Sequence, residues 1–172
     1  DLIENKNLQP VGIILTHAHF DHIGAVDRVR QHYSVPVHVH EKEASWLGNP
    51  ALNGSSFFLA GEITAGQADN LISGPKQMEV ESFSFELMET PGHSPGSITC
   101  YFKDGGFAVV GDTLFQGSIG RTDLPGGNHS ELIENIHGKL LVLPEETLIL
   151  PGHGPVTTIG REMMSNPFLN GF

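Results

Sequence analysis

Cysteine is almost absent from this sequence, since Cys100 is the only one among 172 residues. One cysteine cannot form an intrachain disulfide, and its place in the apolar run SITCYF favours a buried, inert thiol over a nucleophile. Basic residues are also scarce, because nine Lys and Arg stand against 20 Asp and Glu, for a formal net charge of -11. A nucleic-acid partner is therefore not expected, since phosphate binding relies on basic patches.

Long hydrophobic runs are missing as well. No apolar segment approaches the roughly 20 residues that span a bilayer, and the N-terminal DLIENKNLQP lacks the pattern of a signal peptide. We therefore expect a cytoplasmic protein with no membrane partner. The length favours a single domain over residues 1–172, and the sequence shows no internal repeat.

Short apolar runs alternate with polar, helix-like segments along the chain. The patterns predict strands at 11–15, 36–39, 83–89, 97–102, 107–110 and 147–150. They predict helices at 23–33, 41–47 and 129–141, the last capped by Asn128 or Ser130. Residues 48–77 are rich in Gly, Pro, Asn and Ser and predict a long loop of the kind that often covers a site. These elements together predict an α/β or α+β domain.

Metal-capable side chains follow the ends of these predicted strands. The first strand runs into THAHFDH at 16–22, and three later strands each end on a glycine that precedes a histidine or an aspartate. Glycine permits a tight backbone turn there. If the strands share one end of a sheet, their ligands converge. The seven candidate metal ligands are His17, His19, Asp21, His22, His93, Asp112 and His153.

Seven ligands are too many for one ion, so the spacing predicts two. His17 and His19, two apart in an extended segment, point the same way and can hold one ion together with His93. Asp21 and His22 lie on the following turn and can hold a second ion together with His153. Asp112 is able to bridge both, because a carboxylate has two oxygens. We expect zinc, with iron or manganese as alternatives, since the set contains imidazoles and carboxylates but no thiolate.

The remaining histidines have ordinary explanations. An isolated histidine is most often a hydrogen-bonded core or surface residue, and we expect this of those on helix-like segments and of His38 and His40, which alternate on one strand face. Arg121, on a glycine-rich loop, is expected either to bind a substrate carboxylate or to pair with Asp123. Trp46, Phe57 and Phe58 are expected either to form an apolar wall over a cleft or to pack in the core.

The motifs THAHFDH, TPGHSPGS, GDTLF and PGHG occur in this order and resemble those of the metallo-β-lactamase-fold hydrolases. Within that superfamily the chain is most similar to the small glyoxalase II-like group, relatives of hydroxyacylglutathione hydrolase. GDTLFQGSIGRTDLPGG and the closing NPFLN resemble the prokaryotic branch of this group. The resemblance covers nearly the whole chain, and its ligand pattern is far more specific for the superfamily than for a substrate.

The resemblance implies an α+β fold, a metallo-β-lactamase-type αββα sandwich with a dinuclear site at one edge of its two sheets. It also implies that N-terminal strands are lacking here, because family members carry further strands and an IDPG-like turn before the first motif. Full glyoxalase II enzymes continue into a helical glutathione-holding domain and follow the last ligand histidine with Glu-Tyr. Gly154 and Pro155 follow His153 here, so recognition of glutathione is not implied.

We therefore expect a metal-dependent hydrolase of thioesters or related acyl bonds, with a small-molecule acyl thioester as its partner. A metal-bridging hydroxide would serve as nucleophile, and metal charge would stabilise the oxyanion. Asp21 is the candidate catalytic residue, because it can both ligate and orient or deprotonate that water. The alternatives are a sulfur dioxygenase of the same fold with one iron, a lactonase, or a non-catalytic module that metals merely stabilise. The complete second ligand set favours the hydrolase.

Overall fold

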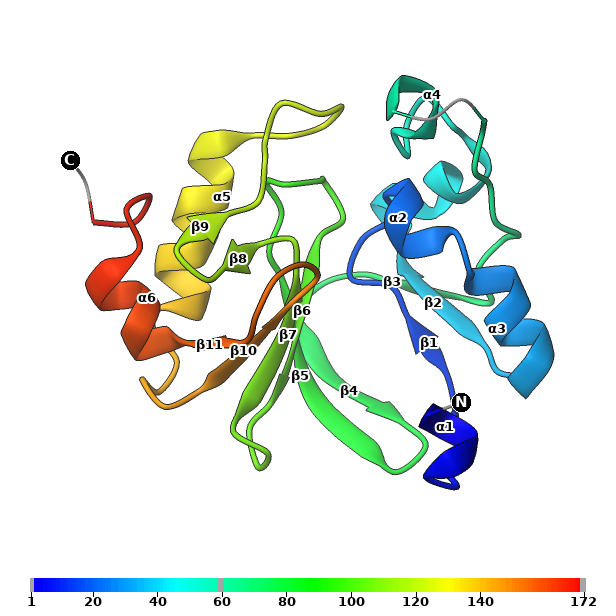
Figure 1. Cartoon of the computed structure of the whole chain (residues 1–172), viewed down its shortest axis with the longest axis horizontal. Coiled ribbons are helices and arrows are strands. Elements are labelled where there is room, and N and C mark those ends of the chain that lie inside the picture. The colour runs from blue at the N-terminus through cyan, green and yellow to red at the C-terminus, as the bar shows by residue number, and fades with distance from the viewer. Residues whose placement is uncertain (1, 59–60, 171–172) are drawn as a thin grey trace.

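A computed structural model describes residues 2–58 and 61–170 of the chain (Figure 1). The helices are α1 (Leu2–Asn5), α2 (Phe20–Ile23), α3 (Val26–Tyr33), α4 (Ser55–Phe58), α5 (His129–Asn135) and α6 (Ile159–Ser165), with the 3-10 helix η1 (Glu41–Gly48) and the π-helical turn η2 (Ile136–Leu140). The strands are β1 (Ile13–Ile14), β2 (Val37–His40), β3 (Asn70–Ile72), β4 (Lys76–Val80), β5 (Phe83–Glu89), β6 (Ile98–Phe102), β7 (Phe107–Gly111), β8 (Leu114–Phe115), β9 (Ser118–Ile119), β10 (Leu148–Pro151) and β11 (Thr157–Thr158).

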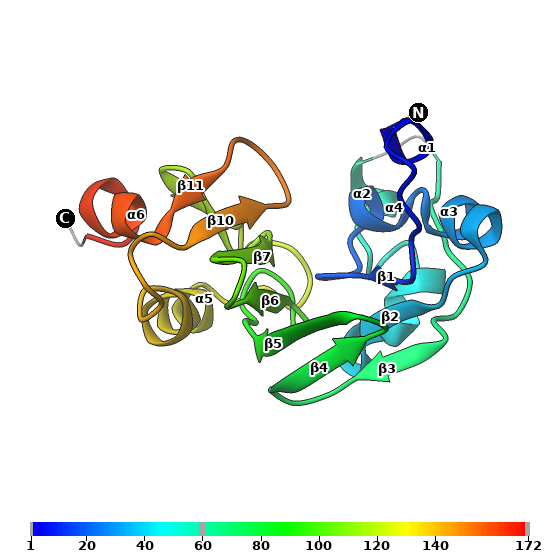
Figure 2. The ribbon, with the colours of Figure 1, turned by 90° about the horizontal axis from the view of Figure 1, so that it is seen from below.

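The strands form two main sheets and one small hairpin. The first sheet has the order β1-β2-β3 and is parallel throughout. The second is mixed, with the order β11-β10-β7-β6-β5-β4, and only its β10–β7 pairing is parallel. The helices α2 and α3 lie outside the first sheet, and α5 and α6 lie outside the second (Figures 1 and 2).

Three apolar clusters separate the resulting four layers. One packs α2, α3 and η1 against the first sheet around Val37. The second lies between the sheets and includes Phe85 and Leu87 of β5. The third packs α5, η2 and α6 against the second sheet around Leu132 and Ile149. Each fully buried large apolar side chain contributes about 1.5–3 kcal/mol, so these clusters hold the layers together. The predicted α+β sandwich is confirmed.

The six predicted strands all form, each within two residues of its expected bounds. The predicted helix at 23–33 is divided into α2 and α3, and the one at 129–141 is α5 followed by η2. The predicted long loop at 48–77 is wrong in part, because it contains α4, β3 and the first residues of β4. The sequence pattern does not predict β3, because this strand is three residues long and two of them are exposed. It is a strand because it pairs with β2 and not because its own residues are hydrophobic.

Two further sequence predictions bear on function. Cys100 is buried in β6, so its predicted burial is confirmed, and this burial raises the pKa of its thiol to about 12, which is consistent with the prediction of an inert thiol. Within the described residues, no helix is both long enough and apolar enough to cross a bilayer.

Candidate metal centre

The candidate ligands come from four segments of the chain, which are the three loops after β5, β7 and β10 and the loop and helix after β1. β5, β7 and β10 run in the same direction, because β6 is antiparallel to both β5 and β7, and β10 is parallel to β7. His93, Asp112 and His153 follow the carboxyl ends of these three strands. From the other sheet, the loop after β1 carries His17 and His19, and the helix α2 that follows it carries Asp21 and His22 (Figure 1). Strand direction makes the three loops of the second sheet converge, and the segment after β1 meets them.

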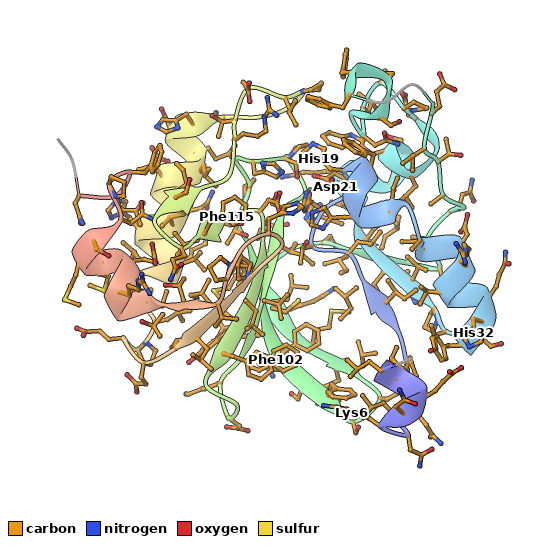
Figure 3. All side chains as sticks on the ribbon, in the orientation of Figure 1. Lys6, His19, Asp21, His32, Phe102 and Phe115 are labelled. Atoms are coloured by element: carbon orange, nitrogen blue, oxygen red, sulfur yellow. The ribbon has the colours of Figure 1, made fainter. Side chains whose placement is uncertain are left out.

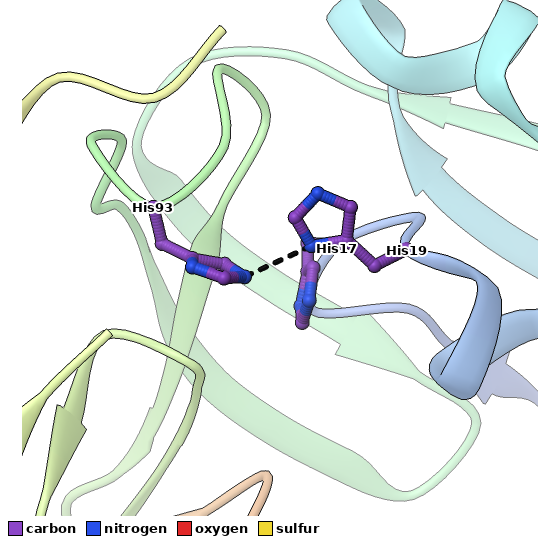
Figure 4. Close-up of side chains that lie close together, drawn as sticks. All are labelled: His17, His19 and His93. Carbon is purple, nitrogen blue, oxygen red and sulfur yellow. Dashed lines mark hydrogen bonds between the residues drawn. The ribbon is translucent and has the colours of Figure 1, made fainter. Parts of the chain in front are cut away.

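His17, His19 and His93 form the first group. Their ligand-capable atoms all lie within 4.8 Å of one another. His19 Nδ1 is 2.9 Å from His93 Nε2, and the ring centroids of His17 and His93 are 4.8 Å apart (Figure 4). The backbone carbonyl of Arg121 lies 2.8 Å from His93 Nδ1 and accepts a hydrogen bond from it, which leaves Nε2, the nitrogen that faces His19, as the atom able to bind a metal. The carbonyl of Arg121 is a contribution that sequence reasoning missed.

Asp21, His22 and His153 form the second group, also within 4.8 Å. His153 Nε2 is 2.9 Å from Asp21 Oδ2. Asp112 lies between the two groups, because its Oδ1 is 3.4 Å from His22 Nε2 while its Oδ2 is 3.6 Å from His153 and 3.7 Å from His93. The structure therefore brings all seven predicted residues together. Both expected groups are present, and a third group of His17, His22 and Asp112 connects them, which places Asp112 where a bridging carboxylate would stand.

The chemistry of these atoms fits a metal better than a packed core. Among the described residues, five buried side-chain nitrogen or oxygen atoms lack a hydrogen-bond partner, and four of the five belong to the predicted ligand set. They are His17 Nε2, His19 Nε2, His22 Nε2 and Asp112 Oδ1. Leaving buried polar atoms unpaired is costly, so such a concentration indicates that they are directed at a ligand. The imidazole and carboxylate donors suit divalent zinc, iron or manganese.

Three groups of the cluster have pKa shifts that suit cation binding. His22 does not, because burial acts to lower its pKa but the contact with Asp112 and the charges of Asp112 and Asp21 outweigh it and raise the pKa. Burial and then repulsion from the neighbouring histidines hold the pKa of His17 well below its ordinary value, and burial followed by repulsion from His93 lowers the pKa of His19 to about 4. For Asp112 burial acts to raise the pKa, but the close approach of His22, 3.4 Å away, and the charges of nearby histidines outweigh it and lower the pKa. At neutral pH these three groups therefore offer neutral imidazoles and an ionised carboxylate, the forms that bind metals.

These shifts predict a pH effect on the metal-free protein. The pKa of His19 is 6.5 in the unfolded chain and about 4 in the folded one, so below pH 6.5 the unfolded state binds the proton first and is favoured. At pH 5 this costs about 2 kcal/mol of folding free energy. We expect the free energy of unfolding in urea of the metal-free protein to show that loss between pH 7 and pH 5, and the loss in His19→Asn to be about 2 kcal/mol smaller. Equal losses in the wild type and in His19→Asn would contradict the assignment of this pH effect to His19.

The glycines that precede three of the candidate ligands have different roles. Gly92 and Gly111 have φ angles of +133° and +54°, which side-chain-bearing residues rarely adopt, so the predicted tight turns before His93 and Asp112 are present. Gly152 has no such angle. A Cβ on Gly152 would overlap Asp112 Oδ1 and lie 2.9 Å from His22 Cε1, so glycine there makes room for the ligand cluster.

A pocket of about 610 Å³ opens beside the cluster. Its lining includes candidate ligands, among them His19 and Asp21, and apolar side chains such as Phe115; Figure 3 labels these three residues. Phe58 also lines this pocket, whereas Trp46 is only 5% exposed and belongs to the core.

Two of the remaining sequence alternatives are decided by contacts. Arg121 lines the pocket, but its guanidinium already forms a two-bond ion pair with Asp123, at 2.7 and 2.9 Å, so the pairing alternative is the one observed. His40 Nε2 is 2.6 Å from Glu89 Oε1, an ordinary hydrogen-bonded role, and neither His38 nor His40 belongs to the ligand groups.

A model of the metallo-beta-lactamase superfamily matches residues 1–153. The probable metallo-hydrolase YqgX of Bacillus subtilis is 53% identical over 170 residues, which cover 99% of this chain and 81% of that protein. The hydroxyacylglutathione hydrolase GloC of Haemophilus influenzae is 38% identical over 169 residues, covering 98% and 80%.

Solved structures show the same relationship. The B3 metallo-beta-lactamase BLEG-1 superposes with a TM-score of 0.96 at 52% identity, covering 99% of this chain and 82% of its own. TTHA1623, solved in a di-iron-bound form, superposes with a TM-score of 0.85 at 39% identity, covering 98% and 82%. The family resemblance inferred from the four motifs is confirmed.

Proposed function

This chain belongs to the metallo-beta-lactamase superfamily, and from that premise we propose that it is a dinuclear metal-dependent hydrolase of thioesters or related acyl bonds. The observation that carries the proposal is the meeting of two complete ligand groups around Asp112 at the wall of one pocket. A metal that merely stabilised the fold would not need donors on a pocket wall. The name of GloC supports a thioester of the hydroxyacylglutathione type as the substrate class.

Each part of the site has a chemical task in this proposal. Divalent ions held by the seven residues would supply a nucleophile by lowering the pKa of water, and would polarise the acyl carbonyl. Asp21 has its Oδ2 2.9 Å from His153 Nε2 and lies on the pocket wall, so it can orient a water and accept its proton. The apolar wall, with Phe58 and Phe115, holds the acyl part of the substrate and excludes water from it.

Zinc is the proposed ion, because all-imidazole and carboxylate sites with open positions suit it. Iron is the alternative that a specific observation favours, since the related TTHA1623 was solved with two irons. Metal analysis of the purified protein, combined with turnover on a panel of thioesters, a lactone and a β-lactam, tests the proposal. The β-lactam is included because BLEG-1 is described as a metallo-beta-lactamase. A protein with two ions that hydrolyses none of these acyl compounds would contradict the hydrolase.

Within this function we expect glutathione itself to contribute little specificity. The metal ligands and the apolar wall supply what acyl hydrolysis needs, while a tripeptide thiol needs charged partners for two carboxylates and an amine. Among the described residues that line the pocket, Arg121 is the one basic side chain apart from the histidines, and Asp123 already pairs with it. Steady-state kinetics on one acyl group carried by several thiols should give comparable kcat/KM values. A preference of about 100-fold for the glutathione ester, about 2.7 kcal/mol, would show a glutathione site.

A sulfur dioxygenase with one iron is the competing function. Such an enzyme needs two histidines and a carboxylate, which leaves the second ligand group without a purpose, and here that group is assembled in full. Oxygen uptake with a persulfide, measured on the same preparation as the thioester panel, separates the two. Oxygen consumption with one bound iron and no thioester hydrolysis would favour the dioxygenase.

A further inference from the structure

Glu43 is a fully buried carboxylate with no place in the ligand set. It lies in η1 with 0% exposure. Its Oε2 accepts a hydrogen bond of 2.6 Å from the backbone N–H of Ala18, and its Oε1 accepts one of 2.7 Å from the N–H of Gly96. These partners are 25 and 53 residues away along the chain. One side chain therefore connects two loops that are distant in sequence.

The two loops are the ones that carry the first ligand group. Ala18 lies between His17 and His19, so its peptide groups orient both imidazoles. Gly96 closes the turn that begins at His93. Hydrogen bonds that a charged carboxylate accepts from backbone N–H groups are about twice as strong as neutral ones. The Glu43 carboxylate thus fixes the separation of these loops at the place where three histidine rings must meet.

The surroundings of Glu43 hold it in this position. His40, the last residue of β2 in the first sheet, precedes η1, and its Nδ1 accepts a hydrogen bond from the backbone N–H of Lys42. Its Nε2 donates a hydrogen bond of 2.6 Å to Glu89 of β5 in the second sheet. These two bonds anchor the start of η1 to both sheets. Gly96 is needed for the close approach, because a Cβ there would lie 2.9 Å from Glu43 Cγ and 3.0 Å from Cδ. Any side chain at this position would displace the carboxylate.

We propose that Glu43 is a positioning residue that sets the geometry of the His17, His19 and His93 group and so determines how tightly that group holds its ion. This inference rests on the proposed metal centre and extends it to a residue that touches no metal. An amide cannot replace the carboxylate, because Gln has one acceptor oxygen and its NH₂ would confront a backbone N–H. Losing such outer contacts typically weakens metal binding by about 10–100-fold.

The test compares Glu43→Gln and Gly96→Ala with the wild type. Gly96→Ala keeps the Glu43 carboxylate but displaces it from the two loops. If Glu43→Gln does not fold, the same measurements are therefore made on Gly96→Ala. Zinc affinity is measured by competition with a chelator, and the cobalt-loaded proteins are compared by visible absorption, which reports ligand geometry. We expect about 10–100-fold weaker binding of one of the two ions and an altered cobalt spectrum in both variants.

Glu162→Gln is the matched control. Glu162 is also 0% exposed and also accepts from a backbone N–H, that of Gly117 at 2.8 Å, but its partners belong to none of the ligand loops. We expect it to lower the melting temperature while keeping both ions and the wild-type cobalt spectrum. If a folded Glu43→Gln or Gly96→Ala protein behaves in the same way, Glu43 is merely structural and the proposal is overturned. A wild-type chain that binds no divalent ion would overturn the metal centre itself and this inference with it.

Discussion

Asp112→Ala is expected to reduce hydrolytic turnover by more than about 100-fold and to release bound metal. The side chain of Asp112 is 11% exposed, and its two oxygens face His22 on one side and His93 and His153 on the other. Removing it takes a negative ligand from both groups at once. A loss among outer contacts typically costs about 10–100-fold, so the loss of a shared ligand should exceed that range. Activity and metal content per folded protein are the measurements.

Two further variants make the result specific to the ligand role. Asp112→Asn keeps the shape of the side chain but removes its charge, so it should retain some metal yet remain far below the wild type in turnover. Asp104→Ala removes an exposed carboxylate from the turn between β6 and β7, away from the pocket, and should behave like the wild type. Near-normal turnover and metal content in Asp112→Ala would remove this residue from the site.

Metal removal should have an effect of similar size. The proposed ions contribute several kcal/mol to stabilising the transition state, about 1000-fold in rate, so a chelator-treated protein should be nearly inactive. Titrating zinc back should restore turnover with a break at two equivalents per chain. Full recovery at one equivalent, or turnover that survives chelation, would contradict the dinuclear mechanism.

An exposed histidine provides the control for this titration. His32 lies on α3, away from the ligand loops, and its side chain is 61% exposed (Figure 3). His32→Ala should still require two equivalents, whereas His93→Ala should no longer show the two-equivalent break. If removing His32 changed the stoichiometry, part of the bound metal would be on the surface rather than in the cluster.

Several features of the site were visible in the sequence because they depend on neighbouring residues. The spacing of His17 and His19 in an extended segment, and the turn that carries Asp21 and His22, depend on local geometry alone. The glycines before His93 and Asp112 likewise mark turns, and both have positive φ. These signals named the seven residues that the structure brings together, while their binding of metal stays a prediction for the experiments above.

Other features depend on contacts between distant segments and left no local pattern. β3 is mostly exposed and is defined by its partner β2, so its sequence looked like a loop. The orienting carbonyl of Arg121 belongs to the backbone, which every residue possesses. Glu43 looked like one more acidic residue on a helix, because nothing near it in sequence shows that its oxygens reach loops 25 and 53 residues away.

The sequence by itself determined the kinds of donor, their local spacing and the family to which the chain belongs, because these follow from residue identity and from a few backbone angles. The sequence predicted two groups around Asp112 only on the condition that the strands share one end of a sheet. The tertiary structure decided that condition, because β5, β7 and β10 run in the same direction and their loops therefore meet. It also decided which buried carboxylate holds the loops together. The direction of the strands and the burial of the Glu43 carboxylate are properties of the packed sheets, and they arise from strand pairings between distant parts of the chain.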